Sequence, residues 1–189
     1  MTEEELATLC KGGDRNALKL LYDRYAAWMM GISMRYIGDE ERSRDILHDS
    51  FVKIFGSVQR FEYRGGAGLL EAWIGKIVVN TALASLKKES SWVALHEWEV
   101  IHEGKYTELA EESETALYDA VSDEAIVLCL GKLPVKLRTV FNLFVFEDMT
   151  HSDIARELGL TESASRVRLH RVKTVLGKEI KEYIKSTEP

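Results

Sequence analysis

The stretch THSDIARELGLTESASRVRLHRVKTVL, residues 150–176, decides how the second half of this chain folds. Thr150 followed by Asp153 makes a capping-box pattern, in which side chains bond the unpaired backbone donors at the start of a helix. The apolar residues after Asp153 fall on one helical face, and Gly159 stands where a chain leaves a helix with a positive φ angle. These features predict a short helix between Thr150 and Gly159.

A second helix is predicted directly after this glycine. Leu160 can fill the corner between two crossing helices, and Thr161 can cap the second one. The apolar residues that recur three and four positions apart are predicted to face inward: Leu169, Val172, Leu176 and Ile180. The residues predicted to face mostly outward are cationic or titratable: Arg166, Arg168, His170, Arg171 and Lys173. Two such helices match the helix-turn-helix that lays a recognition helix in the major groove of DNA, with a plain helical hairpin as the alternative.

Composition places the chain among globular proteins. Of its 189 residues, 46% are hydrophobic and 9% aromatic, which is enough for one mid-sized domain or two small ones with packed cores. The start of the sequence lacks a signal-peptide pattern, and we expect no segment apolar enough to span a membrane, so a cytoplasmic protein without direct membrane insertion is predicted. Cys10 and Cys129 stand alone and are expected to be reduced, buried thiols.

The charge of the chain changes sharply along its length. The formal net charge is −6, but residues 89–124 hold eleven acidic residues and one basic residue. Residues 1–88 hold 13 basic and 12 acidic residues, and residues 125–189 hold 11 and 8. Because salt screens exposed charges beyond about 10 Å, a basic helix can bind DNA beside a distant acidic segment. We predict an all-α fold of two small helical domains, at 1–88 and 123–189, joined by an acidic linker at 89–122.

Capping signals divide the first domain into helices. Thr2 with Glu5 makes a capping box for a short helix that ends at the glycine pair 12–13. Asp14 can cap the next helix, which is predicted to end at Gly38. The predicted core residues of this second helix follow its period: Leu18, Leu21, Tyr22, Tyr25, Met29, Ile32 and Tyr36.

The helix predicted from about residue 40 to residue 55 has two different faces. The residues expected to face inward are apolar: Leu47, Phe51, Ile54 and Phe55. The residues expected to face outward form a mixed-charge stripe: Asp45, His48, Asp49 and Lys53. This stripe is either a solvated surface or, with the aromatic residues beside it, a surface for docking a partner, and the residues alone leave both open.

A glycine-rich stretch precedes the next helix. Gly65, Gly66 and Gly68 resemble part of a phosphate-binding loop, but no strand leads into them and the lysine and hydroxyl of such loops do not follow. We therefore expect a mobile interhelical loop. The following helix carries donors along one edge, which either meet bases and phosphates or form ordinary amphipathic surface: Lys76, Asn80 and Lys87.

Histidines in the acidic segment raise the question of a metal site. His96 is followed by Glu97 and His102 by Glu103, but the two histidines are six positions apart and fall on different helical faces. We expect neither zinc nor any other cofactor here, and a metal hydrolase is the least favoured function.

The second domain is predicted to start near Asp123 with an apolar helix. Pro134 is predicted to open the next helix, because proline is tolerated in a first turn. Apolar residues after it are expected to form the core under the helix-turn-helix: Val140, Phe141, Leu143, Phe144 and Phe146.

Taken in order, four segments resemble a bacterial sigma factor of the extracytoplasmic-function group. LKLLYDRY at 18–25 and GDEERSRDILHDSFVKIF at 38–55 are similar to the first conserved region of this family and to its polymerase-clamp-binding helix. LLEAWIGKIVVNTALASLKK at 69–88 is similar to the helix that recognises the minus 10 promoter element. LPVKLRTVFNLFVFEDMTHSDIARELGLTESASRVRLHRVKTVL at 133–176 is similar to region four, which recognises the minus 35 element. The resemblance covers nearly the whole chain.

The resemblance implies a function that composition cannot show. The protein would bind core RNA polymerase and direct it to a subset of promoters, so it would not be an enzyme and would have no small-molecule substrate. Promoter DNA is an implied partner, and so is an anti-sigma factor. The acidic linker would lie in the nucleic-acid channel of the polymerase, where its charge can mimic phosphates.

The resemblance also implies which residues make these contacts. Those at or beside the core polymerase would be Asp45, Leu47, His48, Asp49, Phe51 and Phe55. Those at the minus 10 element, where a base flips out of the strand, would be Tyr63, Arg64, Lys76 and Asn80. Those at the minus 35 element would be Ser163, Ser165, Arg166, Arg168, His170, Arg171 and Lys173.

At four positions the sequence departs from the family pattern. His48 stands where glutamine is common, and Gly75 stands where an aromatic or larger residue is common. In the recognition helix, Ser165 replaces a usual buried valine and Val167 occupies a usual small polar position. We expect these departures to leave the fold intact and to concern which promoter sequence is recognised and which bases are contacted.

A stand-alone transcriptional regulator is the alternative function. It would use the same helix-turn-helix, with the first domain serving for dimerisation or ligand binding. Such a protein would bind duplex promoter DNA without polymerase, which distinguishes it from a sigma factor.

Overall fold

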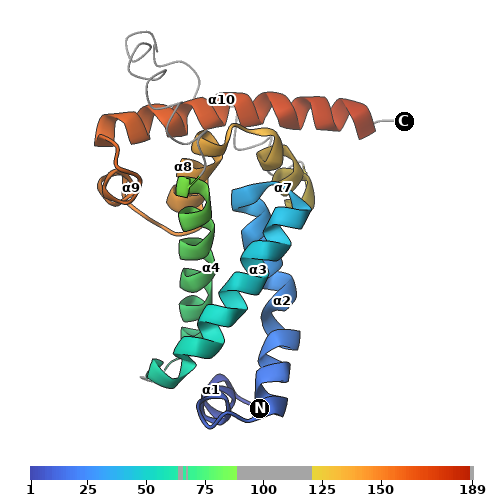
Figure 1. Cartoon of the computed structure of the whole chain (residues 1–189). Coiled ribbons are helices and arrows are strands. Elements are labelled where there is room, and N and C mark those ends of the chain that lie inside the picture. Colours follow the sequence, from blue (N-terminus) through green and yellow to red (C-terminus); the bar gives the residue numbers. More distant parts are fainter. Residues whose placement is uncertain (64–65, 67, 89–120, 188–189) are drawn as a thin grey trace. The chain divides into compact units, whose positions relative to one another are not determined.

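The computed structural model describes residues 1–63, 66, 68–88 and 121–187. Every regular element in these ranges is a helix, which confirms the predicted all-α fold (Figure 1). The chain divides into two compact units, Met1–Lys87 and Lys88–Pro189. The predicted linker at 89–122 lies, except for its last two residues, outside the described residues.

The first unit contains four α-helices and a 3-10 turn: α1 (Glu3–Lys11), α2 (Arg15–Ile37), α3 (Glu40–Ser57), η1 (Val58–Arg60) and α4 (Leu69–Lys88). The predicted capping box is present, since the Thr2 hydroxyl accepts from the Glu5 amide and the Glu5 carboxylate accepts from the Thr2 amide. Asp14 accepts from the Ala17 amide at 2.8 Å and caps α2. Gly38 ends α2 with a φ angle of 74°, as predicted.

The core of the first unit is formed by the facing stripes of its helices. Fully buried side chains come from α1, α2, α3 and α4: Leu6, Leu21, Met29, Tyr36, Ile54, Leu70, Ile74 and Leu86. With 20 residues, α4 is long and apolar enough to cross a membrane by length and composition, which corrects the expectation that no segment would be. Half of its most apolar window is buried in the protein, as in a core helix.

Gly75 of α4 lies against the indole ring of Trp28 on α2. A Cβ atom at position 75 would stand 3.1 Å from the Cη2 atom of Trp28 and 4.0 Å from Ile32 Cδ1. The space that a larger residue at this position would need is therefore filled from the other helix. Trp28 in turn meets the ring of Tyr25 edge-on, with centroids 6.2 Å apart.

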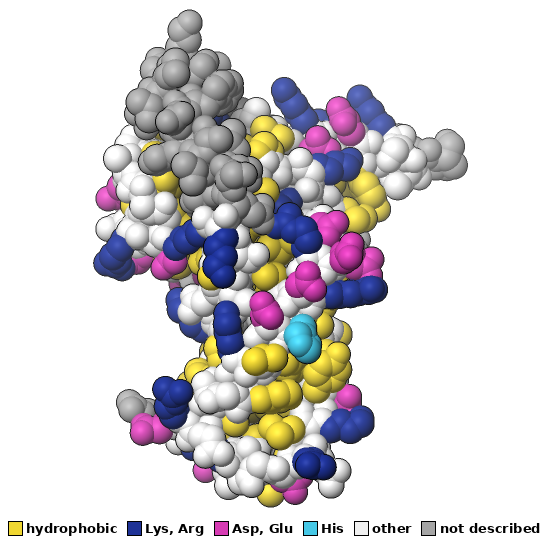
Figure 2. All heavy atoms as spheres, viewed as in Figure 1, with side chains coloured by type: hydrophobic (Ala, Val, Ile, Leu, Met, Phe, Trp, Pro, Cys, Tyr) yellow, Lys and Arg dark blue, Asp and Glu magenta, His cyan; other side chains and the backbone are white. Residues whose placement is uncertain are grey.

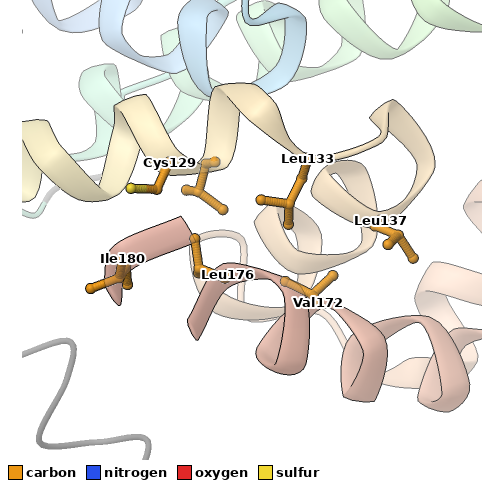
Figure 3. Packing of buried hydrophobic residues seen from close by; sticks show 7 residues of the cluster. Cys129, Leu133, Leu137, Val172, Leu176 and Ile180 are labelled. Carbon is orange, nitrogen blue, oxygen red and sulfur yellow. The ribbon is translucent and has the colours of Figure 1, made fainter. Parts of the chain in front are cut away.

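The second unit contains four described helices: α7 (Asp123–Lys132), α8 (Val135–Val145), α9 (His151–Leu158) and α10 (Glu162–Thr187). Its core forms where the apolar stripe of α10 packs on α7 and on the start of α8 (Figure 3). The cluster comprises Cys129, Leu130, Leu133, Leu137, Val172, Leu176 and Ile180. The inward stripe predicted for the recognition helix is confirmed, and Cys129 is a buried thiol like Cys10.

Three local signals of the predicted helix-turn-helix are confirmed. Thr150 accepts from the Asp153 amide at 3.1 Å and so caps α9. Gly159 leaves α9 with a φ angle of 68°. Thr161 then accepts from the Ala164 amide at 3.1 Å, which caps α10.

Arg138 fastens the end of α7 to α8. Its side chain is buried, and its Nη1 atom donates to the carbonyl of Gly131 at 2.7 Å and to that of Leu130 at 3.4 Å. These carbonyls belong to the last turn of α7, where a cation is favoured by the helix dipole and unpaired acceptors need donors.

Two phenylalanines expected in the core lie on the surface instead. Phe144 and Phe146 are 37% and 43% exposed, so the expectation is wrong for both. The inward face of α8 carries Val140 and Leu143, and Phe144, one residue further, is turned about 100° away from it. Phe144 stacks on the ring of His151 with centroids 4.8 Å apart.

His151 also makes a polar contact between the two helices of the helix-turn-helix. Its Nδ1 atom lies 3.0 Å from the hydroxyl oxygen of Ser165, which is fully buried on α10. Burial lowers the pKa of His151, and the nearby positive charge of Arg166 lowers it further, against a smaller opposing effect of Glu162. The neutral ring is thus favoured in the folded protein.

A larger side chain at position 75 should destabilise the first unit. Gly75→Leu is expected to lower the free energy of unfolding by about 1–3 kcal/mol, because Trp28 already occupies the space. Gly31→Leu is the matched control, since no atom lies within 4 Å of the added Cβ at this exposed helical glycine. Chemical denaturation should show a loss for the first variant only, and equal effects would contradict the close packing.

The stability of the second unit should fall in mild acid. Because the pKa of His151 is lowered in the folded state, the unfolded chain binds more protons below its ordinary pKa of about 6.5. The free energy of unfolding should therefore decrease as the pH falls from about 6.5 toward the folded-state pKa. Thermal unfolding measured between pH 7.5 and pH 5 should show this slope, and His151→Gln should reduce it.

Candidate functional site

A groove lies on the surface of the first unit, between α2 and α3. It has a volume of about 750 Å³ and is lined by Tyr22, Met30, Glu40, Arg44, Leu47, His48, Phe51, Val52 and Phe55. We call it the α2–α3 groove. Figure 2 shows hydrophobic side chains gathered over α2 and α3, with charged side chains beside them.

Three of the residues that line this groove are aromatic, and their rings contact one another. The Tyr22 ring lies 4.5 Å from the Phe51 ring, and the Phe51 ring lies 5.7 Å from that of Phe55. Tyr22 and Phe55 were expected to face inward, but both are exposed. The side chain of Val52 next to them is 59% exposed. The groove is therefore apolar and open to a partner.

The reason for this exposure lies in the inward face of α3. That face carries small residues at helical spacing, Ser43 and Ser50, together with Ile46 and Ile54. The hydroxyl of Ser50 donates to the carbonyl of Ile46 within the same helix, so its polarity is satisfied without another partner. Phe55, one residue after Ile54, is turned to the edge of the helix.

The predicted polymerase-contact residues all lie on this part of α3. Leu47, His48, Phe51 and Phe55 line the groove, while Asp45 and Asp49 are exposed on the same helix. Arg44 pairs with Glu40 at 2.5 Å, and both side chains are largely exposed, so the pair adds little to stability. An apolar groove beside acidic side chains suits a helix that presents apolar and basic residues.

The residues predicted at the minus 10 element lie on α4 and on the loop before it. Lys76 and Asn80 are exposed and one turn apart, so they share an edge of α4. The Tyr63 hydroxyl donates to the Gly66 carbonyl at 2.7 Å. Arg64 lies outside the described residues.

Glu3 contacts the start of α4, although no sequence motif singled this residue out. Its Oε2 atom accepts from the Gly68 amide at 3.1 Å and from the Leu70 amide at 3.4 Å. Its Oε1 atom accepts from the Tyr25 hydroxyl at 3.4 Å. The only local signal was an acidic residue in the first turn of α1, because the amides it meets are more than sixty positions away.

The residues predicted at the minus 35 element divide into two groups along α10. Those at the surface are Ser163, Arg166 and Lys173, which are exposed, and His170 and Arg171, which are partly exposed. Ser165 and Arg168 are buried, with 0% and 3% exposure, so the expected place of Arg168 on the outward surface is wrong. Both lie on the inward stripe with Leu169 and Val172, which follows from their spacing of three and four residues.

Arg166 forms an ion pair with Glu162, one turn earlier on the same helix. Both side chains are about half exposed or more, and such pairs hold the guanidinium only weakly. A phosphate can therefore replace Glu162 as the partner of Arg166 at small cost.

Among the residues that the structure describes, no three His, Cys, Asp or Glu side chains are placed to hold a metal ion. The histidines considered for a zinc site, His96 and His102, lie outside these residues. Gly66 and Gly68 have φ angles of 113° and 80°.

Comparison with known proteins assigns both units. The family model "Sigma-70 region 2" matches residues 21–91, and "Sigma-70, region 4" matches residues 123–176. The chain is similar to the RNA polymerase sigma-H factor of Pseudomonas aeruginosa, with 23% identity over 94% of this chain and 93% of that protein. It is also similar to the ECF RNA polymerase sigma-E factor of Haemophilus influenzae, with 23% identity over 95% and 96%. The ECF RNA polymerase sigma factor SigW of Bacillus subtilis is 22% identical over 91% and 93%.

The two family models together cover about two thirds of the sequence, and the curated relatives align along nearly its whole length. Of the helices that carry the groove and the helix-turn-helix, α3 and α9 fall inside these matches, and α2 and α10 do so for most of their length. The chain therefore belongs to the sigma-70 family, in its extracytoplasmic-function group, and is an RNA polymerase sigma factor that directs promoter-specific initiation of transcription.

Proposed function

We propose that each surface described above has its own part in initiation. The α2–α3 groove docks core RNA polymerase, the exposed edge of α4 binds the minus 10 element, and α10 binds the minus 35 element. In this proposal residues 1–88 and 123–189 are the binding domains, and 89–122 is the linker between them. The groove carries the proposal, because it joins four of the predicted contact residues in one open apolar cavity.

Docking at the groove would bury side chains that are costly to leave in water. Phe55 and Val52 are exposed although both are apolar, and each fully buried apolar side chain contributes roughly 1.5–3 kcal/mol. Asp45 and Asp49 would face basic residues of the polymerase, which favours one orientation and speeds association. His48, at the position where glutamine is common, can still donate or accept a hydrogen bond there.

The α4 edge offers the groups that a flipped base requires. Asn80 can bond a base edge in two places, and Lys76 can bond a phosphate beside it. The partly buried ring of Tyr63 can stack on the base and so offset the few kcal/mol that unstacking costs. Arg64 stays a predicted contact on sequence grounds.

The exposed face of α10 supplies the contacts to duplex DNA. Arg166, Arg171 and Lys173 would divide between phosphates and base edges, with Ser163 and His170 beside them. Ser165 and Arg168 are left out of the proposal as contacts because they are buried. The function of Ser165 would be to position its neighbours through His151.

Sigma factors are not a family of enzymes, and we propose that this chain has neither a catalytic activity nor a small-molecule substrate. It would act in the cytoplasm with the polymerase, and an anti-sigma factor would bind one of its docking surfaces. A stand-alone regulator is the competing function, because a helix-turn-helix alone does not require polymerase.

Run-off transcription tests the proposal directly. Purified core RNA polymerase is incubated with fragmented DNA from the source organism, with and without this protein. Specific transcripts that need the protein would support the proposed function and locate its promoters by their start sites. Binding to duplex DNA without any affinity for core polymerase would instead favour the stand-alone regulator.

A charge reversal beside the groove should weaken docking. Asp49→Arg is expected to lower the affinity for core polymerase by roughly tenfold or more, since a cation would then face the basic partner. Glu182→Arg makes the same change of net charge at an exposed position of α10 and should leave the affinity near wild type. Titration of labelled core enzyme measures both, and unchanged binding of Asp49→Arg would remove α3 from the interface.

Truncation on the recognition helix should change the salt dependence of promoter binding. If Arg171 bonds a phosphate, Arg171→Ala should weaken binding and lower the slope of log affinity against log salt by about one unit. Lys185→Ala, near the far end of the same helix, should leave the slope unchanged. Equal slopes for Arg171→Ala and wild type would mean that Arg171 is not a phosphate contact.

A further inference from the structure

We propose that Glu3 is a positioning residue for promoter opening, because it supplies from α1 the N-terminal cap that α4 lacks. This inference rests on the proposed function of α4 and its preceding loop in binding the minus 10 element. The contacts of the Glu3 carboxylate, which are independent of that function, support it.

The first turn of α4 has free backbone amides. The helix begins at Leu69, and its first backbone bond runs from the Ala72 amide to the Gly68 carbonyl at 2.9 Å. Gly68 therefore occupies the capping position, where it has no side chain to bond the free amides of the first turn. Glu3 Oε2 accepts from the Gly68 amide at 3.1 Å and from the Leu70 amide at 3.4 Å, which is the bonding that a capping side chain provides.

Glu3 is itself held in place by the contacts of α1 and by Tyr25. It is the first residue of α1, whose start is fixed by the Thr2 and Glu5 capping box. The far end of α1 is bonded to the turn after α3, since the Gln59 amide group donates to the Lys11 carbonyl at 3.0 Å. The buried Tyr25 hydroxyl bonds the other oxygen of the Glu3 carboxylate. These contacts restrict the position of the Glu3 carboxylate relative to α4.

Two glycines before α4 have positive φ angles. Gly66 and Gly68 have φ angles of 113° and 80°, and glycine reaches many other conformations equally well. The backbone conformations of these two glycines therefore have to be selected by bonds from elsewhere. Tyr63 bonds the Gly66 carbonyl and Glu3 bonds the Gly68 amide, so each of these two glycines, which belong to the loop proposed to surround the flipped base, is held by one such bond.

The test compares Glu3→Ala with Glu4→Ala in the full chain bound to core polymerase. Glu4 also belongs to the acidic first turn of α1 but is exposed, so it controls for the loss of charge. On a promoter mapped by run-off transcription, Glu3→Ala should reduce strand opening roughly fivefold, as expected for loss of a helix cap. Its affinity for core polymerase should stay within about twofold of wild type, since the cap lies outside the groove lining.

A second measurement follows the cap itself in the free protein. In Glu3→Ala the amide hydrogens of Gly68 and Leu70 should exchange faster with solvent, while those at the start of α2 should not change. Glu3→Gln keeps the size and one acceptor oxygen, so it serves if Glu3→Ala folds poorly. Loss of its negative charge should also lower the pKa of Tyr25, which burial raises first and the charge of Glu3 raises further.

The outcomes separate this inference from the proposed function. If Asn80→Ala impairs opening but Glu3→Ala and Glu3→Gln do not, the positioning role is wrong. If opening falls without faster exchange at Gly68 and Leu70, Glu3 does not act as a cap. If Asn80→Ala leaves opening intact, the proposed role of α4 fails, and with it the role of Glu3 in opening, whereas the exchange data still decide whether Glu3 caps α4.

Discussion

The inward stripe of each long helix is the constraint on which the rest of this structure depends. In α10 the stripe of Leu169, Val172, Leu176 and Ile180 packs on the rest of the second unit, and this packing decides which cations remain outside. In α3 the inward stripe contains two small serines, and Phe55 and Val52 beside it are left at the surface. Core packing therefore also determines the two proposed binding surfaces, because a helix that buries one face exposes the opposite face to solvent.

Local signals in the sequence predicted where helices begin and end, because caps depend on neighbours in the chain. Thr2, Asp14 and Thr150 cap as expected, and Gly38 and Gly159 leave their helices with positive φ angles. The sequence was less informative about which apolar residues are buried. A stretch with apolar residues on more than one face, as in α8, has several possible inward stripes, and only the partner helix decides among them. For this reason Phe55, Phe144 and Phe146 were expected in the core but are exposed. Arg168 was expected at the surface but is buried, for the same reason.

Contacts between distant parts of the chain explain what the sequence could not predict at the candidate site. Glu3 resembles any acidic residue in a first helical turn, and its bonds to Gly68 and Leu70 become visible only when the fold brings α1 to α4. Gly75 is a similar case. The departure from the family pattern is visible in the sequence, but its compensation by Trp28 on α2 is not. At both positions the role of the residue depends on a partner far along the chain.

The contact between buried Ser165 and partly buried His151 links such a departure to the proposed DNA-binding surface. An apolar residue at position 165 would hold α10 by shape alone, which tolerates small rotations of the helix. A hydrogen bond requires a particular direction, so the 3.0 Å contact to Nδ1 restricts the rotation of α10 relative to α9. Arg166 follows Ser165 directly, and its direction is set by the same rotation. Serine at this buried position would therefore restrict the orientation of the proposed recognition surface, although its own side chain is not exposed.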